Sequence, residues 1–300
     1  MKIIYVLLLV FFVAAADTDE NLQQRVSIIE KGAQKEDPLS MFNLGLLYYH
    51  GSGVEKSIEK AIFWYTKAAQ KGLAEAMTNL AHIYLNGIGV AEDEALALKY
   101  YYDAASQGYA LAELNLGLYY EQRAEPSMPK KAYEWYKKAA LQNNTIAQNN
   151  LARLYYFGIG VESDFEKALY WYQEASWQND PTAQYNLAMI YLDGDWVQKD
   201  TQMAIFWLEK SAAGQNHYAQ TKLGDFYATG QYLKKDLDQA ALLYSKAANA
   251  GYDRAMYLIG SCYFYGHGVK QDRGKAKEWM QKAISLGYED ALNFVKRNRL

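Results

Sequence analysis

The feature that most constrains this chain is an internal repeat of about 36 residues. A glycine or alanine recurs seven times, always one residue after a leucine or isoleucine and three residues before a tyrosine. Seven units at a near-constant period predict a repeat architecture in which each unit packs only on its neighbours. The recurring small residues are Gly45, Ala81, Gly117, Ala152, Ala188, Gly224 and Gly260.

The first half of each unit has the pattern of a helix with a small-residue notch. Around Gly45, for example, Leu44 precedes the notch and Tyr48 follows it, and at about 100° per residue they flank one side of a helix. Such a notch predicts the close approach of a second helix, which offsets the poor helix propensity of glycine. Gly-x-Gly-Val turns follow four of these helices and supply left-handed residues at the helix ends. They begin at Gly51, Gly87, Gly158 and Gly266.

The second half of each unit predicts another helix. In the first unit Ala61 is followed three residues later by Trp64 and seven residues later by Ala68, and similar stripes recur in the later units. We expect this stripe to interdigitate with the first helix of the same unit and of the next. Because no single helical hairpin can bury both of its apolar faces, the chain is predicted to be an all-α solenoid of about seven helix-turn-helix units over residues 37–288.

The two ends of the chain differ from the repeats. Residues 1–16 have the features of a signal peptide, with Lys2, an apolar stretch and small residues before Asp17, so we expect a periplasmic or secreted protein. An uncleaved anchor is the alternative, but the apolar stretch is shorter than the roughly 20 residues that span a membrane. Residues 17–36 and 289–300 are predicted to be capping helices, the second with Lys296 at the notch position.

Composition and motifs argue against several function classes. The net charge is −3 and no large basic block is present, so nucleic acid is not an expected partner. We expect no metal or cofactor, because the four histidines are scattered. The single thiol, Cys262, permits no internal disulfide and is interpreted as a core residue. The Ser-x-x-Lys strings at Ser57–Lys60 and Ser127–Lys130 leave a serine-type amide hydrolase as a minor alternative to a protein that is not an enzyme.

The repeated pattern, clearest in residues 57–72 (SIEKAIFWYTKAAQKG) and 165–176 (FEKALYWYQEAS), resembles the Sel-1-like repeat family, a relative of the tetratricopeptide repeat. The resemblance implies a right-handed superhelix that acts as an adaptor for a protein or peptide partner. Bacterial relatives include exported host-interaction proteins, envelope scaffolds and immunity proteins that neutralise toxic lipases, so an immunity protein is the main alternative. A branch linked to β-lactam binding has paired cysteines in each repeat, and this chain has one cysteine in total.

Helix positions −3, +1 and +4 from each notch are predicted to fall opposite the core stripe and to line a concave, partner-binding groove. Many of these residues are aromatic, as at the energetic centres of interfaces. Partial burial of these rings is the alternative. An asparagine at position −2 recurs in the first five units and either binds the backbone of a partner or makes a structural hydrogen bond to the neighbouring unit. The irregular segment 123–129 is interpreted either as a contact loop or as sequence drift. The predicted groove residues are Phe42, Asn43, Tyr49, Asn79, His82, Asn115, Asn150, Arg153, Tyr156, Phe157, Tyr185, Asn186, Met189, Tyr257, Phe264 and Tyr265.

Overall fold

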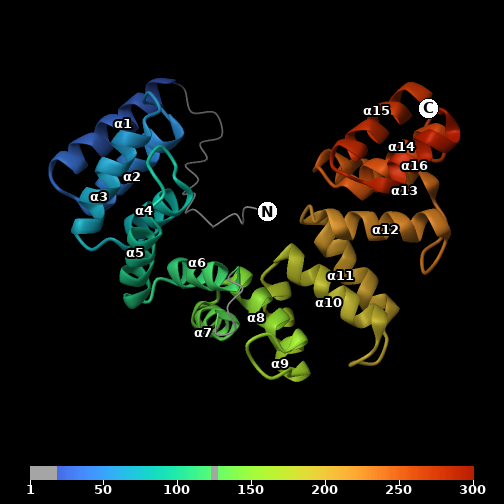
Figure 1. Ribbon diagram of the computed structural model, residues 1–300, viewed down its shortest axis with the longest axis horizontal. Coiled ribbons are helices and arrows are strands. Elements are labelled where there is room, and N and C mark those ends of the chain that lie inside the picture. Colours follow the sequence, from blue (N-terminus) through green and yellow to red (C-terminus); the bar gives the residue numbers. More distant parts are fainter. Residues whose placement is uncertain (1–18, 123–127) are drawn as a thin grey trace. The chain divides into compact units, whose positions relative to one another are not determined.

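A computed structural model describes residues 19–122 and 128–300, which form sixteen α-helices and no strand (Figure 1). The chain divides into two compact units, the first ending at Asp164 and the second beginning at Phe165. Unit 1 contains α1 (Asp19–Gln34), α2 (Pro38–His50), α3 (Ile58–Gln70), α4 (Ala74–Asn86), α5 (Glu94–Ser106), α6 (Ala110–Glu121), α7 (Met128–Leu141) and α8 (Thr145–Phe157). Unit 2 contains α9 (Phe165–Trp177), α10 (Pro181–Asp193), α11 (Thr201–Ala213), α12 (His217–Thr229), α13 (Leu237–Asn249), α14 (Asp253–Tyr265), α15 (Arg273–Ser285) and α16 (Glu289–Asn298).

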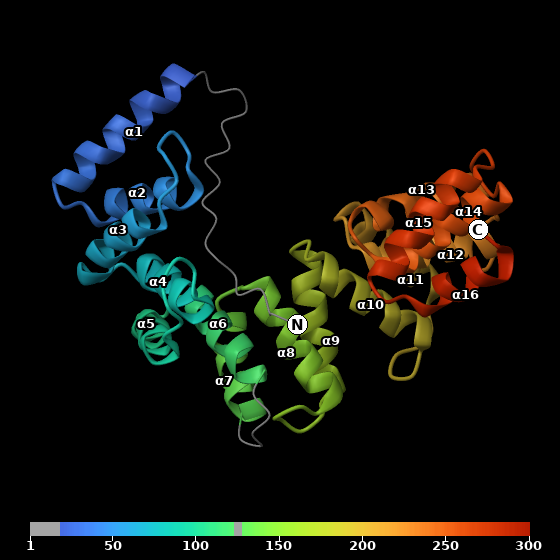
Figure 2. The same cartoon turned by 45° about the horizontal axis from the view of Figure 1, so that its top comes forward.

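Within each unit, every helix packs against the helix before it and the helix after it in the chain (Figures 1 and 2). The even-numbered helices α2 to α14 carry the notches and are called the A helices. The odd-numbered helices α3 to α15 carry the alanine stripes and are called the B helices. The predicted all-α solenoid of helix-turn-helix repeats is therefore confirmed, with α1 lying before the first repeat and α16 after the last.

The turns between helices are built by capping interactions. The carbonyl of the tyrosine three residues after a notch accepts a hydrogen bond from the residue that caps the next B helix, as when Ser57 N–H donates to Tyr48 at 2.9 Å. The Ser57 hydroxyl then accepts from the backbone N–H of Lys60 at 3.2 Å, which is the role of a helix N-cap. Capping therefore accounts for the first Ser-x-x-Lys string. Ser127 of the second string lies outside the described residues.

In the first, third and sixth repeats, where the notch is a glycine, it is filled by a ring from the B helix of the same repeat. A Cβ added at Gly117 would lie 2.5 Å from the Tyr136 ring, and one added at Gly45 would lie 2.6 Å from the Tyr65 ring. The ring comes from the fourth residue after the B-helix alanine. The prediction that the third residue belongs to the buried stripe is wrong in most repeats, because that residue is only half-buried. Trp64, for example, is only half-buried. The fourth residue after the B-helix alanine is buried in all seven repeats, as Tyr65, Tyr101, Tyr136, Tyr172, Leu208, Tyr244 and Met280.

Helical geometry explains this correction. At about 100° per residue, the fourth residue lies about 40° from the alanine and the third about 60° away on the other side, where the helix flank begins. The small residue seven positions on lies about 20° from the alanine, so it shares the buried side with the alanine and the fourth residue. Trp207 is an exception, because it is 2% exposed although it occupies the third position.

Two of the predicted features lie outside the described residues, namely the signal peptide and most of the irregular segment 123–129. Across the residues that the structure does describe, none of the helices has the length and apolar character required to cross a bilayer. Cys262 is buried, and burial raises the pKa of its thiol to about 11, as expected for a core residue.

Candidate partner-binding surface

Position −3 of the A helices is mostly buried, which corrects part of the predicted groove. Phe42 is 1% exposed, and its ring centroid lies 5.7 Å from that of Tyr65. Thr78 and Leu114 are equally inaccessible at this position. Position −3 lies about 60° from the notch rather than opposite it, and Phe42 there packs against the ring that fills the notch. The prediction that Phe42 lines an exposed groove is wrong.

The asparagines at position −2 connect neighbouring repeats. Asn79 and Asn115 are fully buried, so neither is available to a partner, and their assignment to the groove is wrong. Burial raises the pKa of the Tyr65 hydroxyl, and the side chain of Asn79 opposes part of this rise. Asn150 acts in the same way on Tyr136. Asn79 and Asn150 therefore each lie beside a buried tyrosine of the preceding repeat, which favours the structural interpretation. Asn43, Asn150 and Asn186 are half-buried.

A charged network occupies the A helices at the end of unit 1. The Tyr136 hydroxyl donates to Oε2 of Glu121 at 2.6 Å, and Arg153 forms an ion pair with Oε1 of the same carboxylate. Burial, followed by the charge of Glu121, raises the pKa of Tyr136. Arg153 was predicted to line the groove, and its side chain is 30% exposed. Its guanidinium is already held by Glu121, so its first role is to join α8 to α6.

Unit 2 contains a second network of the same kind. The Tyr244 hydroxyl donates to Oδ1 of Asp225 at 2.8 Å, and Arg254 forms a 2.7 Å ion pair with Oδ2. As in unit 1, a ring buried in the notch sends its hydroxyl to the surface of the A helices. There a carboxylate links it to an arginine of the following repeat. Arg254 lies close enough to Tyr252 to lower its pKa, although burial has the larger effect and the pKa is raised overall.

Aromatic side chains continue from this network across unit 2. The ring centroids of Tyr185 and Tyr218 are 5.8 Å apart, and those of Tyr218 and Tyr252 are 5.0 Å apart. The centroids of Tyr257 and Phe294 are separated by 5.9 Å. These five residues, from α10 to α16, are called the aromatic row. Tyr218 is 47% exposed and the other four are half-buried, so the row combines anchored rings with accessible surface.

Sequence reasoning found only part of this row. Tyr185 and Tyr257 were predicted, whereas Tyr218, Tyr252 and Phe294 were missed. Tyr218 and Tyr252 lie at the beginnings of A helices, before the three positions that were considered. They lie six and eight residues before their notches, so no single recurring offset could have found both of them.

The other predicted groove residues are more scattered. Phe157 and Tyr265 are 64% and 51% exposed, and Tyr49, Tyr156, Met189 and Phe264 are half-buried. His82 is half-buried, and burial lowers the pKa of its imidazole. Next to Tyr257 and Phe294, a pocket of about 510 Å³ is lined by Asp290, Asn293, Lys296 and Arg297.

Comparison with protein families gives a match over almost the whole described chain. The Sel1 repeat model matches residues 38–73, 74–109, 110–144, 145–180, 181–216, 217–252 and 253–288. A comparison with curated proteins gives no match.

Comparison with solved structures supports the fold. A Sel1 repeat protein from Oxalobacter formigenes is 31% identical, with 96% of this chain and 83% of that chain covered and a TM-score of 0.75. A protective antigen of uropathogenic Escherichia coli strains is 26% identical over 92% and 76% of the two chains, with a TM-score of 0.46. The immunity protein Pa5087 from Pseudomonas aeruginosa is 24% identical over 63% and 73%, with a TM-score of 0.47. The first structure alone carries the structural comparison.

Proposed function

Because this chain belongs to the Sel1 repeat family, we propose that it is a scaffold that holds a segment of a protein partner on the aromatic row of unit 2. Proteins built from Sel1 repeats are generally non-catalytic and bind other proteins. The assignment of the partner to the aromatic row is specific to this chain and rests on the geometry of unit 2.

The observation that carries the proposal is the continuity of the rings from Tyr185 to Tyr252. Tyrosine is enriched at the energetic centres of protein interfaces, because a rigid ring gains contact area at a small cost in side-chain entropy. The rings of this row are held by one another and by Arg254, whose guanidinium is held in turn by Asp225. A partner therefore meets a surface that is already ordered, which reduces the entropy cost of binding.

The chemistry of the aromatic row indicates which groups of a partner it would bind. The exposed edges of the rings favour apolar or aromatic side chains, and the tyrosine hydroxyls can exchange hydrogen bonds with backbone amides. An extended protein segment offers both groups at regular spacing. If residues 1–16 are removed as a signal peptide, this partner is met in the periplasm or outside the cell.

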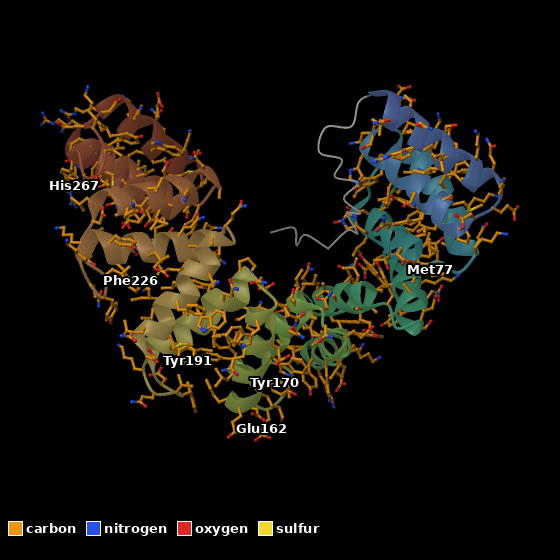
Figure 3. The ribbon with its side chains drawn as sticks, turned by 180° about the vertical axis from the view of Figure 1, so that it is seen from behind. Met77, Glu162, Tyr170, Tyr191, Phe226 and His267 are labelled. Carbon is orange, nitrogen blue, oxygen red and sulfur yellow. The ribbon has the colours of Figure 1, made fainter. Side chains whose placement is uncertain are left out.

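The experiment that tests the proposal is affinity capture from the source of the protein, with Tyr218→Ala/Tyr252→Ala compared with the unmodified chain. The double variant is expected to lose the bound partner by at least tenfold while its helical content at the temperature of the capture stays unchanged. Tyr170→Ala is the matched control, since Tyr170 is 51% exposed on α9 and does not belong to the row (Figure 3). Full retention of the partner by the double variant would remove the aromatic row from the proposal.

The identity of the captured protein decides between a general scaffold and an immunity protein. Recovery of one toxic enzyme as the dominant partner, together with inhibition of that enzyme by the purified chain, would identify an immunity protein. Recovery of several envelope or host proteins without inhibition would identify an adaptor.

A further inference from the structure

The turns that follow α10, α12 and α14 form one edge of unit 2, and this edge differs from the aromatic row. The turns comprise residues 194–200, 230–236 and 266–272 and are called the turn edge. Tyr191 and Phe226, near the ends of α10 and α12, and His267, in the third turn, mark this side of the unit (Figure 3).

Large aromatic residues replace glycine in two of the three turns. Four other turns of the chain have glycine at the equivalent position, with φ between 68° and 71°, as at Gly53 and Gly268. The turn edge has Trp196 and Tyr232 there instead. Tyr232 keeps the left-handed conformation, with a φ of 68°, which strains a residue that carries a Cβ.

These two aromatic residues remain accessible. Trp196 is 63% exposed although it stacks on Phe165, and Tyr232 is 43% exposed although it contacts Phe226. A strained turn residue that leaves much of its ring in solvent adds little to folding. Its strain is more simply explained by a role at the surface.

Lysines accompany the two rings. The two residues that precede each B-helix cap include Lys199, Lys234, Lys235 and Lys270, all of them exposed. Lys199 lies 5.9 Å from the centre of the Tyr232 ring, so adjacent turns contact each other. None of the four forms an ion pair with any residue that the structure describes.

The acidic residues of the turn edge are placed differently. Three of its four aspartates cap the following helices, where the positive end of the helix dipole partly offsets their charge. Asp195 is the fourth. The corresponding positions of the unit 1 turns carry one lysine and three glutamates, Glu55, Glu92 and Glu162. The lysine enrichment is therefore specific to unit 2.

We propose that the turn edge is a peripheral binding surface for an anionic lipid membrane. Tryptophan and tyrosine prefer the membrane–water interface, and lysines are attracted to anionic headgroups. Apart from His267, the basic residues of the three turns are all lysines and include no arginine, which suits a diffuse negative surface better than the paired carboxylates of a protein. The rings project from turns, so they can enter an interface without unfolding any helix.

The test is flotation of the full chain with vesicles of phosphatidylcholine alone and with one-third phosphatidylglycerol. Every variant is prepared with the same N-terminus, checked by mass spectrometry, so that residues 1–16 cannot cause a difference. The chain is expected to float with the anionic vesicles and to be released by salt. Lys234→Glu/Lys235→Glu should lower binding by roughly thirtyfold or more, because each lysine near an anionic surface contributes about a fivefold factor.

The variants Trp196→Ala and Tyr232→Gly separate binding from folding. Each is expected to lower binding by about tenfold, and Tyr232→Gly should melt at a higher temperature because it relieves the left-handed strain. Lys246→Glu and Tyr170→Ala, on the exposed B-helix surface, are the matched controls and should bind normally. A chain that does not float with anionic vesicles overturns the proposal, as does unchanged binding by both aromatic variants. Binding of poly-glutamate without binding of vesicles would assign the edge to an acidic protein instead and would equally overturn it.

Discussion

A methyl group added at Gly117 tests the packing rule on which the repeats depend. The new Cβ would lie 2.5 Å from two carbons of the Tyr136 ring, and ordinary contacts are 3.4 to 4 Å, so the ring must move by about 1 Å. The ring has little room, because it is fully buried and its hydroxyl is held by Glu121 at 2.6 Å. Overpacking of this kind costs about 1–3 kcal/mol.

Helix propensity acts in the opposite direction. Replacing glycine by alanine inside a helix stabilises it by about 1 kcal/mol. Alanine also occupies the notch in other repeats, as Ala81 and Ala152 show, so the fold tolerates the added methyl group when the ring is placed to suit it. For Gly117→Ala we therefore expect a net destabilisation of up to about 2 kcal/mol.

Gly260→Ala is the matched control, because its new Cβ would lie 3.2 Å from the flexible end of Met280 and 3.3 Å from Cβ of Trp279, much farther than the Tyr136 ring lies from the new Cβ at Gly117. Here the gain in helix propensity should equal or exceed the cost of overpacking, so the variant should be as stable as the unmodified chain or more stable by up to about 1 kcal/mol. The assay is urea unfolding followed by circular dichroism. Hydrogen exchange of α6–α7 and α14–α15 is measured in parallel, since a repeat array need not unfold in one step. Equal effects of the two substitutions, or a more stable Gly117→Ala, would refute the packing rule.

Three further predictions follow from buried side chains. Tyr136→Phe should lose about 1.5–3 kcal/mol in urea unfolding, because it removes a hydrogen bond to a charged carboxylate, and an unchanged midpoint would contradict this. Tyr172→Ala should cost about 3–5 kcal/mol and Trp171→Ala clearly less, and the reverse order would restore the third position as the core position. Burial raises the pKa of Glu113, so the folded state binds this proton more tightly than the unfolded state and stability falls as the pH rises through the raised pKa. Glu113→Gln should therefore gain stability over the unmodified chain at pH 7 but not at pH 4, and a difference that stays constant between these pH values would argue against burial as the cause.

The repeat itself was predictable because its signals are local. A notch such as Gly45 and a turn glycine such as Gly51 are required by backbone conformation and close approach, which depend on a few neighbouring residues. The period, the helix pairs and the turn positions therefore followed directly from the sequence. Which side of the B helix fills the notch could not be read from the sequence. Trp64 and Tyr65 are both large and lie on adjacent positions, so only the packed helix pair distinguishes them.

The surface was less predictable because it depends on how successive repeats overlap. Offsets within one A helix placed Phe42 and Tyr185 at the same position, yet one is buried and the other belongs to the aromatic row. The contact between Tyr185 and Tyr218 joins two repeats, and no offset counted within one helix can reveal it. The buried Asn79 shows the same limit, since its neighbour Tyr65 lies on the B helix of the preceding repeat.

Two buried tyrosines, Tyr136 and Tyr244, show what a tyrosine adds to the notch beyond a phenylalanine. A phenylalanine at position 136 or 244 would fill the notch equally well, but it would leave the carboxylate above it with the arginine as its one remaining side-chain donor. The tyrosines at these positions bury their rings and at the same time deliver a hydroxyl to Glu121 or Asp225 on the A-helix surface. In unit 2 the same carboxylate holds Arg254, which lies against Tyr252 of the aromatic row. The core and the proposed binding surface therefore share one set of side chains, so a change in the notch of the sixth repeat should alter the order of the rings that meet the partner.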